Sequence, residues 1–214
     1  KAVAIVGFEQ DAPNTNPTLG LEEVYAVLTR MPRQTSLKAG KFKSAFGSLN
    51  RVHTHDMPQT TVPLPIIAFF GEEGLVSEGI SFNYLMPSAQ PGRSFDLTME
   101  AFSAENPILF SDTAARGLGG LIRGKYFTEL SDVDFLEVGA SAAAGRNDGA
   151  PGIGKQATYM YGGDFMYKWR ALQPKGIWSV LAQVEFFYMD REDAGVQVTR
   201  RNAWGAYGLV QIQP

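Results

Sequence analysis

The chain has 214 residues, of which 19% are charged, 12% are aromatic and 23 are glycine, and it contains no cysteine. This composition excludes collagen, a disulfide-stapled miniprotein and a charge-rich disordered chain, and the net charge of −3 gives no basic surface for nucleic acid. The longest apolar runs, 2–6 and 66–70, are far shorter than the roughly 18 residues of a transmembrane helix. Lys1 is not a methionine, so we expect a processed chain or a fragment.

The first seven predicted elements are strands, recognised by β-forming composition, bounding turns and alternation of apolar with polar residues. The alternation is clear at 93–103, where apolar Phe95 and Leu97 alternate with polar residues. The strands at 20–31, 34–46 and 133–145 are predicted from composition and bounding turns alone. In chain order the strands are expected at 1–9, 20–31, 34–46, 79–87, 93–103, 117–129 and 133–145.

The clearest pattern follows at 159–188, in two long runs in which every second residue is apolar. Residues 173–176, Gln-Pro-Lys-Gly, join the runs, and their Pro and Gly favour the tight turn of a β-hairpin. Each run covers about 13 to 15 residues, whereas an ordinary soluble strand has about 5 or 6 and a tilted transmembrane strand needs about 9 to 11. A tenth strand is expected at 201–213, and no helix is predicted.

The connections between these strands alternate in length. Short ones are expected at 32–33, 88–92, 130–132 and 173–176, and long ones at 10–19, 47–78, 104–116, 146–155 and 191–200. The Greek-key crossovers of a soluble sandwich would scramble this order. Transmembrane barrels have it, because they carry short turns on one side and long loops on the other.

A lipid bilayer explains both the strand length and the alternation. In hydrocarbon every backbone amide must be paired within the protein, so only helices and closed barrels cross. Trp169 and Trp178 flank the turn at 173–176, at a depth where amphipathic rings gather. The alternative is a soluble barrel or sandwich with the aromatic face as its core. We expect an all-β fold, an antiparallel up-and-down transmembrane β-barrel, in a single domain over 1–214.

One stretch resembles a known family. It reads Leu37-Lys38-Ala39-Gly40-Lys41-Phe42-Lys43-Ser44-Ala45-Phe46-Gly47-Ser48-Leu49-Asn50 and is similar to the pattern G-K-F-K-x-x-F-G-x-x-N of bacterial outer-membrane porins, of the phosphate-selective O/P type. Residues 71–74, before the strand at 79–87, also look like such barrels. The resemblance covers roughly 20–90 and implies passive transport in the outer membrane of a Gram-negative bacterium. It carries over no phosphate site, because those porins have a dense basic lumen and this chain is net acidic.

The end of the chain departs from a complete barrel. Residues 210–214 lack the terminal aromatic that the resemblance leads one to expect, and ten strands would close into a cylinder largely filled by side chains. We therefore expect the chain to be a segment of a longer barrel.

Charged side chains of the alternating strands should avoid lipid, where each Arg or Lys near the midplane costs about 2–4 kcal/mol. We expect them either to line a pore and set its ion preference or to fill a narrow lumen with salt bridges. Opposite charges on adjacent strands, such as a pair of Lys168 with Glu185, could serve either role. The pore-lining candidates are Asp96, Glu100, Arg123, Lys125, Asp164, Lys168, Arg170 and Glu185. The lipid-facing candidates are Phe165, Tyr167, Trp169, Trp178, Val180, Val184 and Phe186.

The connection at 47–78 is long enough to have a role of its own. Its centre at 62–70 is too apolar for an exposed tip, so we expect the loop to fold into or over the barrel mouth and to constrict the pore. An alternative is that 66–70 forms one more short strand. The loop also holds His53 and His55, but two histidines beside one aspartate are too few for a metal assignment, so neither metal nor cofactor is expected.

An enzymatic site is the third possibility, because some outer-membrane barrels are hydrolases. Suitable residue types are present in Ser48, Asn50, His53, His55 and Asp56. They lie within nine residues of one another, whereas catalytic triads normally gather from separate strands. The glycine-rich residues 117–120 open a strand and not a helix, so they form no phosphate loop. We therefore expect no enzyme.

Together these features predict a porin-like channel through which small hydrophilic solutes or ions diffuse. Pore radius, loop constriction and lumenal charge would control their passage. The alternative is a barrel with a plugged lumen that has a structural or partner-binding role through its outer loops. The expected partners are the lipid bilayer, the solutes, and further copies of the chain or other envelope proteins, but not nucleic acid.

Overall fold

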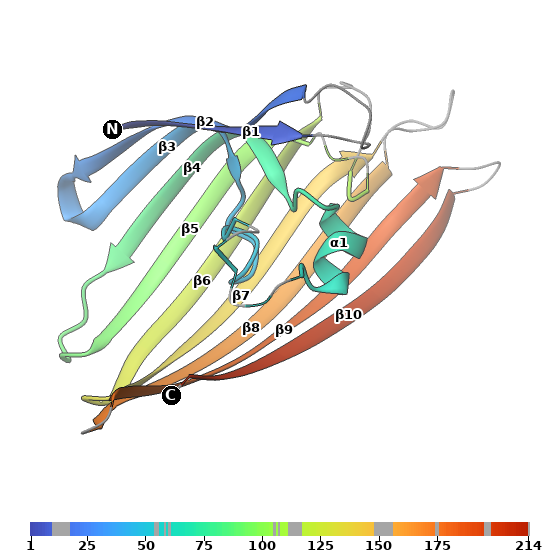
Figure 1. Cartoon of the computed structure of the whole chain (residues 1–214). Helices are drawn as coiled ribbons and strands as arrows, with labels where there is room; N and C mark the ends of the chain where they lie inside the picture. Colours follow the sequence, from blue (N-terminus) through green and yellow to red (C-terminus); the bar gives the residue numbers. More distant parts are fainter. Residues whose placement is uncertain are drawn as a thin grey trace.

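Ten strands form one antiparallel sheet in which the spatial order follows the chain from β1 to β10 (Figure 1). The computed structural model describes residues 1–9, 18–53, 56–57, 59, 61–104, 106, 108–110, 117–147, 156–173, 176–194 and 198–213. The strands are β1 (Ala2–Glu9), β2 (Thr18–Met31), β3 (Thr35–Lys43), β4 (Val76–Met86), β5 (Arg93–Ser103), β6 (Leu118–Ser131), β7 (Asp134–Asn147), β8 (Gln156–Gln173), β9 (Gly176–Ala194) and β10 (Val198–Gln213). The predicted all-β, antiparallel up-and-down arrangement is confirmed.

The strands are longest at the C-terminal end, where β8 has 18 residues, β9 has 19 and β10 has 16. β9 and β10 pair without interruption up to Ala194 opposite Val198, so only three residues join them. The prediction of a long connection at 191–200 is therefore wrong. The polar residues there continue the ladder, because its hydrogen bonds come from the backbone and do not require apolar side chains.

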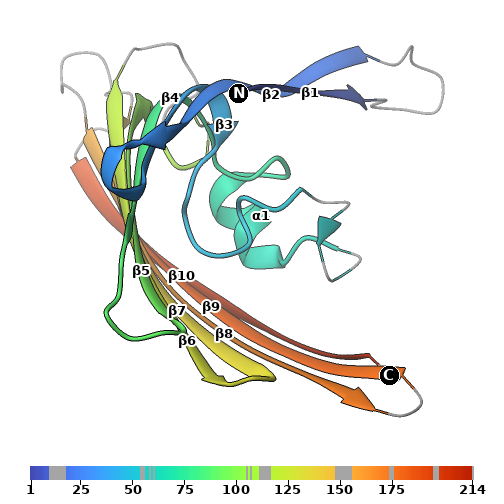
Figure 2. The same ribbon diagram turned by 90° about the vertical axis from the view of Figure 1, so that its left-hand side faces the viewer.

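The sheet is strongly bent but not closed. Among the described residues β1 pairs only with β2 and β10 only with β9, and Figure 2 shows the two edges far apart. The prediction of a closed barrel is thus wrong for these ten strands as they stand. A chain segment lies within the curve of the sheet (Figure 2).

This segment, residues 44–75 between β3 and β4, is called the insert below. It contains a helix, α1 (Leu64–Phe70), so both the absence of helices and a short strand at 66–70 are wrong. Pro63 and Pro65 favour a helix start, and Gly71, with φ of 90°, ends it. A short 3-10 helix, η1 (Pro32–Gln34), joins β2 to β3. No helix within the described ranges is long and apolar enough to cross a membrane.

The hydrophobic core lies between the insert and the concave face of the sheet. Phe46 and Phe70 of the insert have ring centroids 5.3 Å apart, and each packs on Phe187 of β9, at 6.1 and 5.9 Å. Ile66 and Leu75 are buried in the same cluster. Full burial of such a side chain stabilises the fold by about 1.5–3 kcal/mol, which offsets part of the cost of ordering the insert.

Candidate functional site

Cross-strand register divides the sheet residues into two chemically different faces. On the convex face one row of directly opposed residues crosses nine strands and contains only apolar and aromatic side chains. In order from β2 to β10 the row is Leu28, Leu37, Phe82, Met99, Ile122, Ala142, Tyr161, Tyr188 and Trp204. The insert lies on the concave face (Figure 2). The same face carries buried charged residues, including Glu100, Arg123, Asp164 and Glu185.

The convex face exposes large apolar side chains from most of its strands, including Ile80, Ile122, Tyr161, Val184 and Trp204. All seven lipid-facing candidates, Phe165, Tyr167, Trp169, Trp178, Val180, Val184 and Phe186, lie on this face by register. The alternate residues of β8 from 159 to 169 and of β9 from 178 to 188 on this face include no charged side chain. Contact of this face with lipid stays a prediction.

All eight pore-lining candidates lie on the concave face, but their surroundings differ. Arg123 on β6 and Asp164 on β8 are both buried and form a two-fold hydrogen-bonded ion pair, at 2.6 and 2.9 Å. Arg123 also donates to Ser141 Oγ on β7, at 2.9 Å. Since the pair bridges β6 and β8 across β7, the two charges compensate each other and stabilise this part of the sheet.

Two of the candidate carboxylates hold the insert. Glu185 on β9 accepts hydrogen bonds from the backbone N–H of Ser48 and of Leu49, the latter at 3.0 Å, and from the Ser48 hydroxyl. Glu100 on β5 accepts from the N–H of Ala45, at 3.2 Å. These N–H groups of the insert would otherwise be buried without hydrogen-bond partners. The two carboxylates on the sheet are their acceptors.

Two further strands fasten the same stretch of backbone. Ser141 Oγ accepts from the N–H of Gly47 at 3.1 Å, and a carboxylate oxygen of Glu23 on β2 accepts from the N–H of Lys43 at 2.6 Å. Together with Glu100 and Glu185, these acceptors come from four strands. None of this was predicted from the sequence, because nothing in the local pattern of Glu23 or Ser141 distinguishes a residue that binds distant backbone.

The remaining candidates lie nearer the ends of the strands. Lys125 Nζ is 3.6 Å from a carboxylate oxygen of Glu137, and Asp96 accepts from the side chain of Asn83. Lys168 lies opposite Leu181 in the register, and Glu185 lies opposite Asp164, so the expected pairing of Lys168 with Glu185 is wrong. Alternation within a strand shows on which face of the sheet a side chain lies. It does not show which residue of the next strand lies opposite.

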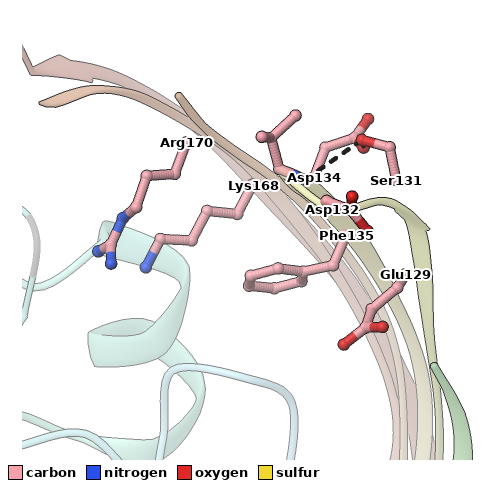
Figure 3. A pocket seen from close by; sticks show the side chains of 8 residues that line it. Glu129, Ser131, Asp132, Asp134, Phe135, Lys168 and Arg170 are labelled. Atoms are coloured by element: carbon pink, nitrogen blue, oxygen red, sulfur yellow. Dashed lines mark hydrogen bonds between the residues drawn. The ribbon is translucent and has the colours of Figure 1, made fainter. Parts of the chain in front are cut away.

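Lys168 and Arg170 lie at the short-turn end of β8, beside a pocket of about 400 Å³. Figure 3 shows both side chains extending from the sheet on the side where the insert lies, next to Phe135 and Glu129. No ion pair between described residues involves either cation. Among the described residues they are therefore candidate cations on the concave side whose charge no ion pair compensates.

The stretch at 37–50 has a structural role. Gly40, with φ of 135°, lets β3 approach β2 so closely that a Cβ would stand 2.2 Å from the Val24 carbonyl oxygen. Gly47, with φ of 65°, turns the insert beside the Glu185 carboxylate. The Asn50 amide donates to the carbonyls of Ser44 and Leu75, at 2.8 and 3.0 Å, and so ties the two ends of the insert together.

The insert also brings charge into the hollow. The exposed Arg51 is within electrostatic reach of Arg123 on β6 and of the carboxylates of Asp96, Glu100 and Asp164. The insert therefore adds a cation to a wall that already carries both signs.

The candidate residues for metal binding or hydrolysis that the structure describes contact different partners. His53 Nδ1 is 3.3 Å from Glu22 Oε2, and its Nε2 is 3.1 Å from Glu23 Oε2, whereas His55 lies outside the described residues. Ser48 binds Glu185 and accepts from Gln183 at 2.7 Å. Asn50 ties the ends of the insert, as described above, and Asp56 is exposed. Within the part of the chain that the structure covers, no three His, Asp or Glu residues gather as metal ligands.

Comparison with known proteins identifies one relative and no family. No family model matches the chain, and no solved structure matches it. A protein of Aquifex aeolicus (strain VF5), described only as uncharacterized, is 42% identical over 84 residues. The match covers 39% of this chain and 16% of that protein, so the aligned segment is a small part of the relative's length.

Proposed function

We propose that the sheet is part of the wall of a β-barrel in the outer membrane of a Gram-negative bacterium, a porin-like channel through which small hydrophilic solutes or ions diffuse. The convex face would meet lipid, the concave face would line the lumen, and the insert would narrow the passage. Passage would depend on the width left beside the insert and on the charge of the wall, without chemistry.

The observation that carries this proposal is the difference between the two faces. An exposed apolar patch of more than a few hundred Å² is rare on a soluble monomer and marks an interface. Here the apolar row crosses nine strands and is extended along β8 and β9, toward the turn that joins them, by further uncharged residues. Such a surface fits hydrocarbon, where only a closed set of strands satisfies its own backbone.

The long hairpin of β8 and β9 supports the same proposal. Their 18 and 19 residues exceed the 9 to 11 or so that a tilted strand needs to cross a bilayer, so the strands would project beyond it on one side. Charged convex residues such as Asp190, Glu192 and Arg200 occur near the end of β9 and the start of β10, beginning with Asp190, two residues after Tyr188 of the apolar row. Charges at the strand ends and none between them are what a bilayer requires.

A second candidate function rests on the anchoring of the insert. Hydrogen bonds from four strands and a buried aromatic cluster hold residues 43–49 on the wall. An insert fixed this firmly suits a permanent plug in a barrel with a structural or partner-binding role. The two candidates differ in whether water and ions pass beside the insert.

Single-channel recording in planar lipid bilayers separates these candidates. The variant that lacks residues 54–70 should give a wider and less selective channel than the intact chain, because α1 and its buried Ile66, Phe69 and Phe70 are removed. Discrete conductance steps in the intact chain support the channel. A silent intact chain with a conducting deletion variant favours the plugged barrel, and equal conductance of the two proteins overturns the role of the insert.

A further inference from the structure

Two cations lie close together at the short-turn end of β8. Lys168 and Arg170 are two positions apart on one strand, so they share the concave face with Cα atoms about 7 Å apart. Neither side chain forms an ion pair or a hydrogen bond with another described residue. Two like charges at this spacing repel each other, and an anion held between them would relieve the repulsion.

An aromatic wall lies beside the two cations. Phe135 on β7 is directly opposite Lys168 in the register and lines the same pocket of about 400 Å³. Its ring packs against that of Phe127 on β6, with centroids 5.3 Å apart, and Val133 adds a second apolar side chain to the pocket. The volume falls within the roughly 300–1,000 Å³ of small-molecule sites, which combine apolar walls with a few charged groups.

Three carboxylates also line the pocket, and Figure 3 shows them apart from the two cationic groups. Asp134 accepts a hydrogen bond from the hydroxyl of Tyr167, which lies on the convex face, at 3.2 Å. Glu129 is opposite Phe135 in the register, but its Oε2 is turned toward β5, where a Cβ at Gly92 would stand 2.6 Å away. Asp132 is exposed in the turn between β6 and β7. An anion on the β8 side of the pocket would therefore meet the cations first.

We propose that this pocket binds a small organic acid, with the carboxylate between Lys168 and Arg170 and an apolar ring or chain against Phe135. The guanidinium holds both carboxylate oxygens, and the ammonium adds a second positive charge. The apolar stems of the two cations extend the surface of the Phe135 ring. An inorganic anion would satisfy the cations but leave this apolar surface uncovered. The inference rests on the proposed channel and names the class of solute that its wall retains.

Benzoate is the probe for this site, and acetate is its control because it carries the same carboxylate without the ring. Each is titrated into the full chain in zwitterionic detergent micelles, where binding requires no channel, and NMR follows the amides of residues 133–135 and 168–170. Benzoate should shift these amides and bind at least about tenfold more tightly than acetate, because the ring adds an aromatic contact. Equal affinities overturn the proposal, and so do benzoate shifts that spread evenly over all strands.

Three variants test the charges. Arg170→Gln and Lys168→Gln should each weaken benzoate binding by about tenfold or more, since each removes a charged hydrogen-bond donor. Arg200→Gln is the matched control, because Arg200 is also exposed but lies at the start of β10, with its guanidinium 3.6 Å from Glu192. It should leave binding unchanged. Equal weakening in all three variants overturns the inference, because general attraction of anions to the chain would then explain the binding.

Single-channel recording on the same chain separates this inference from the proposed function. Benzoate binding by a chain that gives no conductance steps contradicts the channel and supports the pocket as a binding site. Conductance steps from a chain that does not bind benzoate overturn the pocket and leave the channel standing.

Discussion

The carboxylate of Glu185 accepts a hydrogen bond from the backbone N–H of Leu49 at 3.0 Å, although 136 residues separate the two in the chain. Glu185 is 1% exposed, and it also accepts from the backbone and hydroxyl of Ser48. If the turn at 47–49 moved away from the sheet, the buried carboxylate of Glu185 would lose its hydrogen-bond donors. This contact couples the position of the insert to the integrity of β9.

Gly47→Ala should loosen this turn. The residue has φ of 65°, which costs a non-glycine residue about 1–2 kcal/mol, and a Cβ would stand 3.0 Å from Glu185 Oε1. Gly163→Ala on the convex face of β8 is the matched control, because nothing lies within 4 Å of its Cβ position. Urea unfolding in detergent should show lower stability for the first variant alone; equal stability of the two would contradict the anchoring role of the turn.

Phe165→Arg tests the assignment of the two faces. Phe165 is exposed in the middle of the convex row of β8, so an arginine there would cost about 2–4 kcal/mol in hydrocarbon. That is a large share of the stability of an ordinary fold, so insertion into vesicles should fail. Lys168→Ala, on the opposite face three residues later, should insert as the unaltered chain does. Flotation of the vesicles measures the inserted fraction, and equal insertion of the two variants would refute the assignment.

Local signals were enough to predict the strands. At 93–103 alternation and bounding turns gave the bounds that the structure has, because side chains of a two-faced strand repeat every second residue. The same alternation places Asp96 and Glu100 on one side of β5 without any knowledge of their neighbours. The helix at 64–70 was missed because seven residues cover only two turns, too few for a helical period, and because two isoleucines suggested a strand.

The contacts between the insert and the wall could not be predicted. Lys168 was expected to pair with Glu185, but the register places it opposite Leu181, and a shift of one strand against the next is not encoded within either strand. The hydrogen bond from Leu49 to Glu185 depends on the curvature of the whole sheet, which brings β9 under the insert. Sequence alternation therefore indicates the face of a residue, whereas its partner follows from long-range geometry.

The buried pair of Arg123 and Asp164 should contribute little net free energy to folding, whereas removing one of the two charges should destabilise the fold strongly. Removing one partner of a buried pair typically costs about 3–5 kcal/mol, whereas replacing both with apolar residues is often nearly neutral. Asp164→Leu alone should therefore be strongly destabilising, and Arg123→Met with Asp164→Leu should recover most of the loss. Urea unfolding of the two single variants and the double variant gives the coupling energy. Additive losses would show that the two charges act independently.

Glu185→Ala should release the insert while leaving the sheet paired. The substitution leaves the N–H groups of Ser48 and Leu49 without their acceptor, and each buried donor left unsatisfied costs about 1–3 kcal/mol. The insert can recover this cost only by moving its turn into water, so trypsin cleavage after the neighbouring Arg51 should become at least several-fold faster. Glu185→Gln keeps one acceptor oxygen and should give an intermediate rate. Glu137→Ala is the matched control: its ion pair with Lys125 spans 3.6 Å between partly exposed side chains, and such pairs contribute about 0–1 kcal/mol. If Glu137→Ala accelerates cleavage as much as Glu185→Ala does, the carboxylate of Glu185 is not what holds the insert on the wall.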